Sequence, residues 1–229
     1  MHPEWYYKEF DAVFGSTRRY EEEVSAISRV SSFGGISVEE IGVGLGNHLV
    51  EVLRGEPNEA IGVDVDPEAC RLSSSRFSSD KRVVIRQGDG FINRSNARLL
   101  YCFYCLPQQT NSVCESRARI GHLASHAGDG REAWVEVMDV GRHLAANLHR
   151  PAVEIFRNGN NHLNLRTEAS KTGANIIYSG VMDSYPTEYC VPIARLDDEM
   201  ISDAARQATV SFECHPLSSS NRRVLVRFF

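Results

Sequence analysis

Short apolar runs alternate with helix-like stretches along the first two thirds of the chain. Five runs have the length and composition of strands, and they cover residues 38–42, 60–63, 83–85, 97–106 and 133–138. Helical spacing and capping residues predict helices over 4–30, 48–54, 67–77 and 112–127. Strands that alternate with helices predict an α/β fold with a mostly parallel sheet.

The pattern changes beyond residue 150. Segments that favour β-structure, separated by turn clusters, predict an antiparallel meander over 152–156, 162–167, 174–182 and 188–195. A helix at 196–208 and two strands at 209–214 and 224–228 follow it. We therefore expect one domain over 1–229, with a helical N-terminal segment at 1–35 and an antiparallel insert at 152–195.

Glycines stand at alternate positions directly after the first predicted strand. Gly42, Gly44 and Gly46 let the backbone approach a ligand where a Cβ atom would clash. Asp64 ends the second predicted strand, eighteen residues after Gly46, where a carboxylate can accept hydrogen bonds from ribose hydroxyls. Together these two features predict a site for a nucleoside cofactor.

The register of the glycines separates two kinds of cofactor. The dinucleotide fingerprint G-x-G-x-x-G requires a glycine where this chain has Asn47, and the observed pattern is G-x-G-x-G. With Glu40 two residues before Gly42, the stretch resembles motif I of the class I S-adenosyl-L-methionine (SAM)-dependent methyltransferases. SAM has no phosphate, its carboxylate suits the N–H groups of such a turn, and Glu40 suits its cationic side.

The resemblance extends over most of the chain. It implies the Rossmann-like class I methyltransferase fold, a seven-stranded and mostly parallel sheet, here with the antiparallel insert after strand five. Within the class, the chain resembles small-molecule methyltransferases, especially the bacterial N,N-dimethyltransferases of nucleotide-linked amino sugars. Residues 6–14, 100–103 and 134–137, the last followed by the insert, carry this narrower resemblance.

The resemblance also implies a role for each residue of the cofactor site. Gly42, Gly44 and Gly46 would line the methionine part of SAM, and Val43, bulkier than the usual residue there, is not expected to block it. The other implied positions are Asp64 on the ribose, Val65 on the adenine, Asp89 on the adenine amino group, Gly90 or Phe91 on the ring edge, Cys102 and Phe103 beneath the sulfonium, and Tyr20 as a cover.

Methyl transfer from a sulfonium depends mainly on alignment, and an oxygen acceptor usually needs a base as well. Open α/β sheets bind ligands beyond the carboxyl ends of their strands, so candidate groups are those that follow strands four and five. The candidates are His122, Glu136, Arg142 and His143, with His126, Asp139 and His149 nearby. Four of these candidates also have an explanation without a function. His122 and His126 would lie on a solvated helix face, Glu136 would occupy a face of the sheet, and Arg142 would be solvated.

Composition narrows the possible partners and compartment. A net charge of −5 argues against general attraction to nucleic acid or to an anionic membrane. The N-terminus lacks the pattern of a signal peptide, so we expect a cytoplasmic protein with reduced thiols. Cys102 and Cys105 lie in an apolar run where residues three apart face opposite sides of a strand, which favours core positions over a metal site.

These observations support one main hypothesis and several alternatives. The chain is expected to be a methyltransferase that uses SAM to methylate nitrogen or oxygen of a small molecule, in natural-product or sugar-nucleotide biosynthesis. Residues 152–195 would then form an acceptor wall or a homodimer contact. A SAM-binding protein that does not methylate would have the same motifs. A nicotinamide-dependent oxidoreductase is disfavoured by Asn47, and a nucleic-acid methyltransferase by the acidic charge balance.

Overall fold

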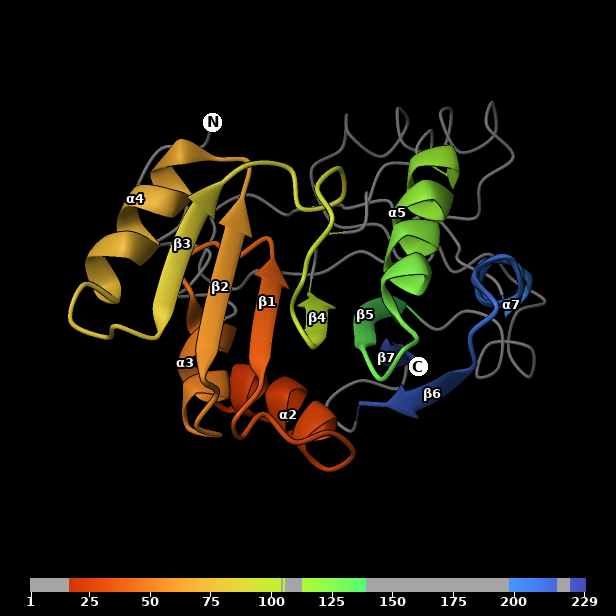
Figure 1. The fold of residues 1–229 in the computed structure, drawn as a ribbon, viewed down its shortest axis with the longest axis horizontal. Coiled ribbons are helices and arrows are strands. Elements are labelled where there is room, and N and C mark those ends of the chain that lie inside the picture. Colours follow the sequence, from red (N-terminus) through yellow and green to blue (C-terminus); the bar gives the residue numbers. More distant parts are fainter. Residues whose placement is uncertain (1–16, 104, 106–112, 139–197, 218–222) are drawn as a thin grey trace, which may run out of the picture.

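Seven strands form a single sheet in the computed structural model, which describes residues 17–103, 105, 113–138, 198–217 and 223–229 (Figure 1). The strands are β1 (Ser37–Ile41), β2 (Glu59–Asp64), β3 (Val83–Gln87), β4 (Leu99–Cys102), β5 (Glu132–Met138), β6 (Phe212–Pro216) and β7 (Arg223–Phe228). The described helices are α2 (Thr17–Ser28), α3 (Asn47–Leu53), α4 (Pro67–Arg76), α5 (Val113–His126) and α7 (Asp198–Ala208). The predicted insert at 152–195 lies outside the described residues.

The strand order places the first and fourth strands side by side at the centre of the sheet. The order is β3-β2-β1-β4-β5-β7-β6, with β1 to β5 parallel and β7 antiparallel to both of its neighbours. The sequence-based prediction of a seven-stranded, mostly parallel α/β sheet is therefore confirmed. Because the strand order reverses between β1 and β4, their carboxyl ends form the switch point at which open α/β sheets bind ligands.

Alternate residues of the central strands bury the two faces of the sheet. Ile41 and Leu100 belong to a cluster with residues of α5 and α7, whereas Val38 and Tyr101 belong to a second cluster with residues of α2 and α3. All four residues of β4 are buried, as expected for a strand covered on both faces. Among the helices that the structure describes, none has the length and apolar character needed to cross a bilayer.

The connection from β3 to β4 shows why two neighbouring acids of β1 have different surroundings. Residues 88–98 contain turns but no helix, and the Ser95 hydroxyl donates to Glu39 Oε2 at 2.8 Å. Glu39 is only 5% exposed, and burial raises the pKa of its carboxyl group. Although Glu39 stands beside Glu40 in a polar pair that suggests a solvated side chain, it is buried, because this connection covers the face of β1 on which Glu39 lies.

Several local predictions are confirmed and two strand boundaries differ. The Asp66 side chain caps α4 by accepting from the Glu68 N–H at 3.0 Å, and the helix begins at Pro67. Strand four ends at Cys102 rather than at residue 106, because its partner β1 turns away after Ile41. The sixth strand begins at Phe212 rather than at residue 209. Thr209 has a left-handed backbone and the Val210 N–H donates to the Ala205 carbonyl, so these two residues close α7 instead.

Replacing Gly46 by alanine should destabilise the protein by about 2–4 kcal/mol, because a left-handed backbone and overpacking both oppose a side chain there. Gly46 has φ 73°, and its Cβ would lie 2.4 Å from the Phe77 ring. Gly121→Ala in α5, where a Cβ meets no described atom within 4 Å, should instead stabilise by about 0.5–1 kcal/mol. Urea unfolding measures both changes, and equal effects of the two substitutions would contradict this account of the turn.

Candidate functional site

The turn between β1 and α3 has a left-handed backbone at each of its three glycines. The φ angles are 77° at Gly42, 50° at Gly44 and 73° at Gly46. A Cβ atom at Gly42 would lie 2.2 Å from Cys105 Sγ, and one at Gly46 would meet Phe77, whereas one at Gly44 would have no described atom within 4 Å. Internal packing therefore explains two of the glycines, whereas no contact among the described residues explains Gly44.

The carboxylate that ends β2 lies at the mouth of this turn. Asp64 Oδ2 accepts from the Gly44 N–H at 2.9 Å, and Asp64 Oδ1 accepts from the Asp66 N–H at 2.9 Å. Asp64 is partly exposed, and the neighbouring Val65 is 65% exposed. An ionised carboxylate can accept about four hydrogen bonds, so Asp64 retains acceptor capacity for a further donor on its exposed side.

A second turn of the predicted cofactor site follows β3. Asp89 Oδ1 accepts from the Phe91 N–H at 2.9 Å. Gly90 between them packs closely on β1, since a Cβ there would lie 2.8 Å from the Ile41 side chain. The Phe91 ring lies 4.7 Å from the Arg119 guanidinium and 6.1 Å from the His122 ring. Helix α5 therefore holds the turn that was predicted to contact adenine.

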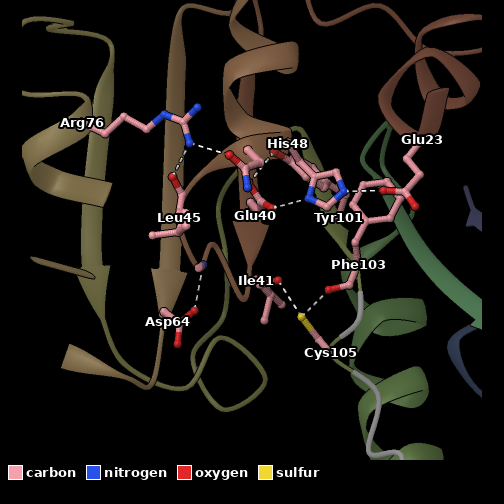
Figure 2. A network of polar contacts seen from close by, with 12 residues as sticks. Glu23, Glu40, Ile41, Leu45, His48, Asp64, Arg76, Tyr101, Phe103 and Cys105 are labelled. Carbon is pink, nitrogen blue, oxygen red and sulfur yellow. Dashed lines mark hydrogen bonds and ion pairs between the residues drawn. The ribbon is translucent and has the colours of Figure 1, made fainter. Parts of the chain in front are cut away.

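A buried network of polar side chains joins residues on both flanks of the glycine turn to α2 and β4 (Figure 2). His48 Nε2 lies 2.6 Å from Glu23 Oε2, and His48 Nδ1 lies 3.3 Å from Glu40 Oε1. The Tyr101 hydroxyl donates to Glu40 Oε2 at 3.0 Å. None of the four residues is more than 5% exposed, so the network joins α2, α3, β1 and β4 away from water.

Two aromatic rings enclose the imidazole at the centre of this network. The Phe103 ring stacks on His48 with centroids 4.2 Å apart, and the Tyr20 ring meets it edge-on at 4.7 Å. Tyr20, Glu40 and Phe103 were each predicted to contact the cofactor. The structure brings all three to His48, so whatever they contribute to a ligand depends on how this histidine is held.

The charges within the network follow from its burial and contacts. Burial lowers the pKa of His48, but hydrogen bonds and charge from Glu23 and Glu40 outweigh that effect and raise the pKa to about 9. Burial raises the pKa of Glu40, which the bonds from His48 and Tyr101 oppose. Burial and the Glu40 charge raise the pKa of Tyr101 well above its usual value. His48 is consequently an imidazolium at neutral pH.

An arginine of α4 holds the glycine turn from its exposed side (Figure 2). Arg76 donates to the Leu45 carbonyl at 2.8 Å and to Asn47 Oδ1 at 2.5 Å. The adjacent Phe77 occupies the space beside Gly46. Asp64 at the end of β2, together with Arg76 and Phe77 at the end of α4, therefore restrains the turn before any ligand binds.

The cysteine pair lies beneath the start of the same turn. Cys105 Sγ lies 2.9 Å from the Ile41 carbonyl oxygen, and Cys102 is 1% exposed. A hydrogen bond with Cys102 and burial both raise the pKa of the Cys105 thiol well above its usual value. Within the part of the chain that the structure describes, no group of three or more His, Cys, Asp or Glu side chains could hold a metal ion.

Two of the four predicted catalytic candidates, His122 and Glu136, lie among the described residues. His122 contacts the Phe91 turn, and burial lowers its pKa, which favours the neutral imidazole. Glu136 is 9% exposed and pairs with Leu225 on the opposite face of the sheet, the face covered by α2 and α3. His122 and Glu136 therefore belong to different faces of the sheet. Arg142 and His143 lie outside the described residues.

Sequence reasoning missed His48, Glu23 and Arg76. His48 stands directly after the glycine motif, which places it on the first turn of α3, and this position was a local signal. Glu23 gave no such signal because it lies in a run of three glutamates that is typical of a solvated helix face. His126, which shares a helix face with His122, was assigned to a solvated or catalytic face. It is only 6% exposed, and its Nε2 has no hydrogen-bond partner among the described residues.

The unfolding free energy should fall on both sides of neutrality. His48 has a pKa raised from 6.5 to about 9, so its contribution is full below pH 6.5 and is lost as pH rises through 9. Burial lowers the pKa of His126 to about 4, so its contribution is present above pH 6.5 and is lost as pH falls through 4. Denaturant unfolding across this pH range measures both limbs.

Two substitutions separate the two histidines. His48→Gln should flatten the alkaline limb, by an amount on the order of 2 kcal/mol, and leave the acid limb in place. His126→Gln should do the reverse. A fall of the unfolding free energy between pH 6.5 and about 8, below the range in which free thiols and phenols titrate, that survives in His48→Gln would show that this imidazole is not charged in the folded protein.

Comparison with solved structures identifies the fold. A scan against protein-family models and a search of curated proteins find no match. An O-methyltransferase family protein from Burkholderia thailandensis superposes with a TM-score of 0.58 at 17% identity, over 96% of this chain and 57% of that protein. Magnesium protoporphyrin IX methyltransferase from Synechocystis PCC 6803, with bound SAH, gives 0.63 at 12% identity, over 98% and 94%.

A third similar structure is the O-methyltransferase family 2 protein from Planctomyces limnophilus DSM 3776 in complex with apigenin, with a TM-score of 0.54 at 14% identity, over 93% of this chain and 61% of that protein. The chain thus spans less than two thirds of the length of the Burkholderia and Planctomyces proteins. These similarities, together with the strand order, show that the chain has the Rossmann-like fold of these methyltransferases.

Proposed function

We propose that this chain is a SAM-dependent methyltransferase that methylates nitrogen or oxygen of a small molecule. One observation carries the proposal: at the switch point between β1 and β4, a Cβ at Gly44 would meet no described atom within 4 Å, and Asp64 beside it is partly exposed. A glycine turn that opens beside a carboxylate at the end of the next strand suits an adenosyl group. The fold, which the methyltransferases compared above share, supports the same conclusion.

The described residues fit SAM as a cofactor. The exposed side of Asp64 has acceptor capacity for the ribose hydroxyls, and Val65 offers an exposed apolar surface for adenine. Asp89, in the turn with Gly90 and Phe91, would accept from the adenine amino group. Gly42, Gly44 and Gly46 provide a backbone without side chains for the methionine part. When bound, SAM supplies an activated methyl group on a sulfonium.

The acceptor is proposed to be a small molecule. Among the proteins with this fold, one is named for magnesium protoporphyrin IX and another binds apigenin, both small molecules. The narrower resemblance to N,N-dimethyltransferases of amino sugars makes an amine acceptor a second possibility beside a hydroxyl. We propose Glu136, Arg142 and His143 as the groups that orient the acceptor or take its proton, and His122 as a fourth candidate that lies beside Phe91.

Asp64→Ala should weaken SAM binding by about 10- to 100-fold, because hydrogen bonds to a charged group contribute about 1.5–3 kcal/mol. Isothermal titration calorimetry measures the affinity. The matched control is Asp66→Ala, which removes a nearby carboxylate that caps α4; it should cost about 1 kcal/mol of stability and leave SAM affinity within about threefold. Unchanged affinity in Asp64→Ala would show that the ribose does not bind there.

Transfer of the methyl group separates an enzyme from a SAM-binding protein that does not methylate. The protein, incubated with methyl-labelled SAM and fractionated small-molecule extracts containing amines or phenols, should transfer label to a small-molecule fraction. The Asp64→Ala variant should transfer label more slowly in proportion to its loss of affinity. Tight SAM binding without transfer to any fraction would support the alternative of a binding protein.

A further inference from the structure

Helix α5 contacts both the turn that follows β3 and the segment that follows β4. The Arg119 guanidinium lies 4.7 Å from the centre of the Phe91 ring and donates to the Cys105 carbonyl oxygen. His122, one helical turn later, meets the same Phe91 ring edge-on at 6.1 Å. Phe91 and Cys105 both pack against the apolar cluster beneath α5. One helix therefore contacts segments that follow strands on opposite sides of β1.

Cys105 extends this contact to the glycine turn (Figure 2). Its Sγ lies 2.9 Å from the Ile41 carbonyl oxygen and 3.0 Å from the Phe103 carbonyl oxygen. A Cβ atom at Gly42 would lie 2.2 Å from the same sulfur. Arg119 thus holds the backbone of a residue whose side chain packs against the start of the glycine turn.

We propose that Arg119 is a positioning residue for the cofactor: by contacting Phe91 and Cys105 at once, it fixes the spacing between the adenine turn (residues 89–91) and the glycine turn (residues 42–46), so that one ligand occupies both. The inference rests on the proposed function, which assigns the two ends of SAM to these two turns. It gives a role to a residue that none of the sequence motifs includes.

A fixed spacing matters because the cofactor is one molecule with two ends. A ligand that binds at two places gains from the second only when the two lie at the distance that the ligand spans. Arginine suits this role, because its planar guanidinium can stack on a ring by one face and donate hydrogen bonds from its edge. The close packing of Gly90 on Ile41 is a competing restraint on the same spacing.

S-adenosylhomocysteine (SAH) and 5′-methylthioadenosine provide a matched pair of probes. Both contain adenosine and a neutral sulfur, but the sulfur of SAH bears the amino-acid chain and the sulfur of methylthioadenosine bears a methyl group. The ratio of the methylthioadenosine Kd to the SAH Kd therefore measures what the amino-acid end adds to binding. A variant that only weakens the fold or the adenine turn changes both Kd values by the same factor, whereas altered spacing weakens SAH more.

The test measures both Kd values by calorimetry, with displacement of SAH for the weaker ligand. Arg119→Met keeps an apolar chain on the Phe91 ring but cannot donate to the Cys105 carbonyl. It should lower the ratio about tenfold, the effect of one charge-assisted hydrogen bond. Phe91→Leu keeps an apolar side chain but removes the ring, and it should lower the ratio about threefold, the effect of a cation–π contact.

The double variant shows whether Arg119 and Phe91 act through one contact. Arg119→Met combined with Phe91→Leu should lower the ratio little further than Arg119→Met alone, because the second substitution then has no guanidinium contact left to remove. The double-mutant cycle isolates this contact, since the other contacts of either residue cancel. Effects that multiply would show that the two residues act independently and would overturn the inference.

Arg117→Met is the matched control on the same helix. Arg117 is exposed and lies two residues before Arg119, a separation that places the two side chains on different faces of α5. This variant should keep the wild-type ratio within about twofold, because it removes the same charge without touching either turn. A similar fall of the ratio in Arg117→Met and Arg119→Met would overturn the assignment to Arg119.

The remaining outcomes are distinct. If Arg119→Met weakens both ligands equally, Arg119 only supports the adenine turn, and if both Kd values stay unchanged, the packing of Gly90 on Ile41 fixes the spacing alone. Either result refutes this inference and leaves the proposed function in place. A wild type that binds neither SAM nor SAH refutes the proposed function, and the inference with it. If Arg119→Met does not fold, as circular dichroism would show, Phe91→Leu tests the same contact from the other side, and an unchanged ratio there overturns the inference.

Discussion

The left-handed backbone of the turn between β1 and α3 is the constraint on which the candidate site depends. Cys105 fills the space beside Gly42, Phe77 fills the space beside Gly46, and Asp64 accepts from the Gly44 N–H. Because these contacts come from three different parts of the chain, the turn has its shape before any ligand arrives. Preorganisation of this kind lowers the entropic cost of binding.

Buried polar groups connect this turn to α2. A buried charge is expensive unless it is paired and hydrogen-bonded, and the bonds among Glu23, His48, Glu40 and Tyr101 meet that requirement. The same bonds hold α2 against α3 and β1, and they surround the imidazole with the rings of Tyr20 and Phe103. Stability and the electrostatics of the site therefore depend on the same residues.

Features that rest on local chemistry were predictable from the sequence. The alternating glycines, Asp64 at the end of β2 and the Asp66 cap of α4 each involve residues close together in the chain, so their spacing is sufficient to recognise them. The strands β2 and β4 were recognisable for a related reason, because burial on both faces makes their central residues apolar. Their ends were less predictable: β4 stops at Cys102 because β1 leaves it, which its own residues do not reveal.

The sequence alone thus determined the α/β class, the mostly parallel sheet, the glycine turn and the carboxylate beside it, since short-range spacing and periodicity encode them. Only the tertiary structure decided which partner each polar side chain meets. Glu39 and Glu40 are adjacent, yet one bonds with Ser95 and the other with His48 and Tyr101, because successive residues of a strand face opposite sides of the sheet. Likewise His48 meets Glu23, a residue 25 positions earlier in the chain, because α2 packs on α3, and no local pattern records that contact.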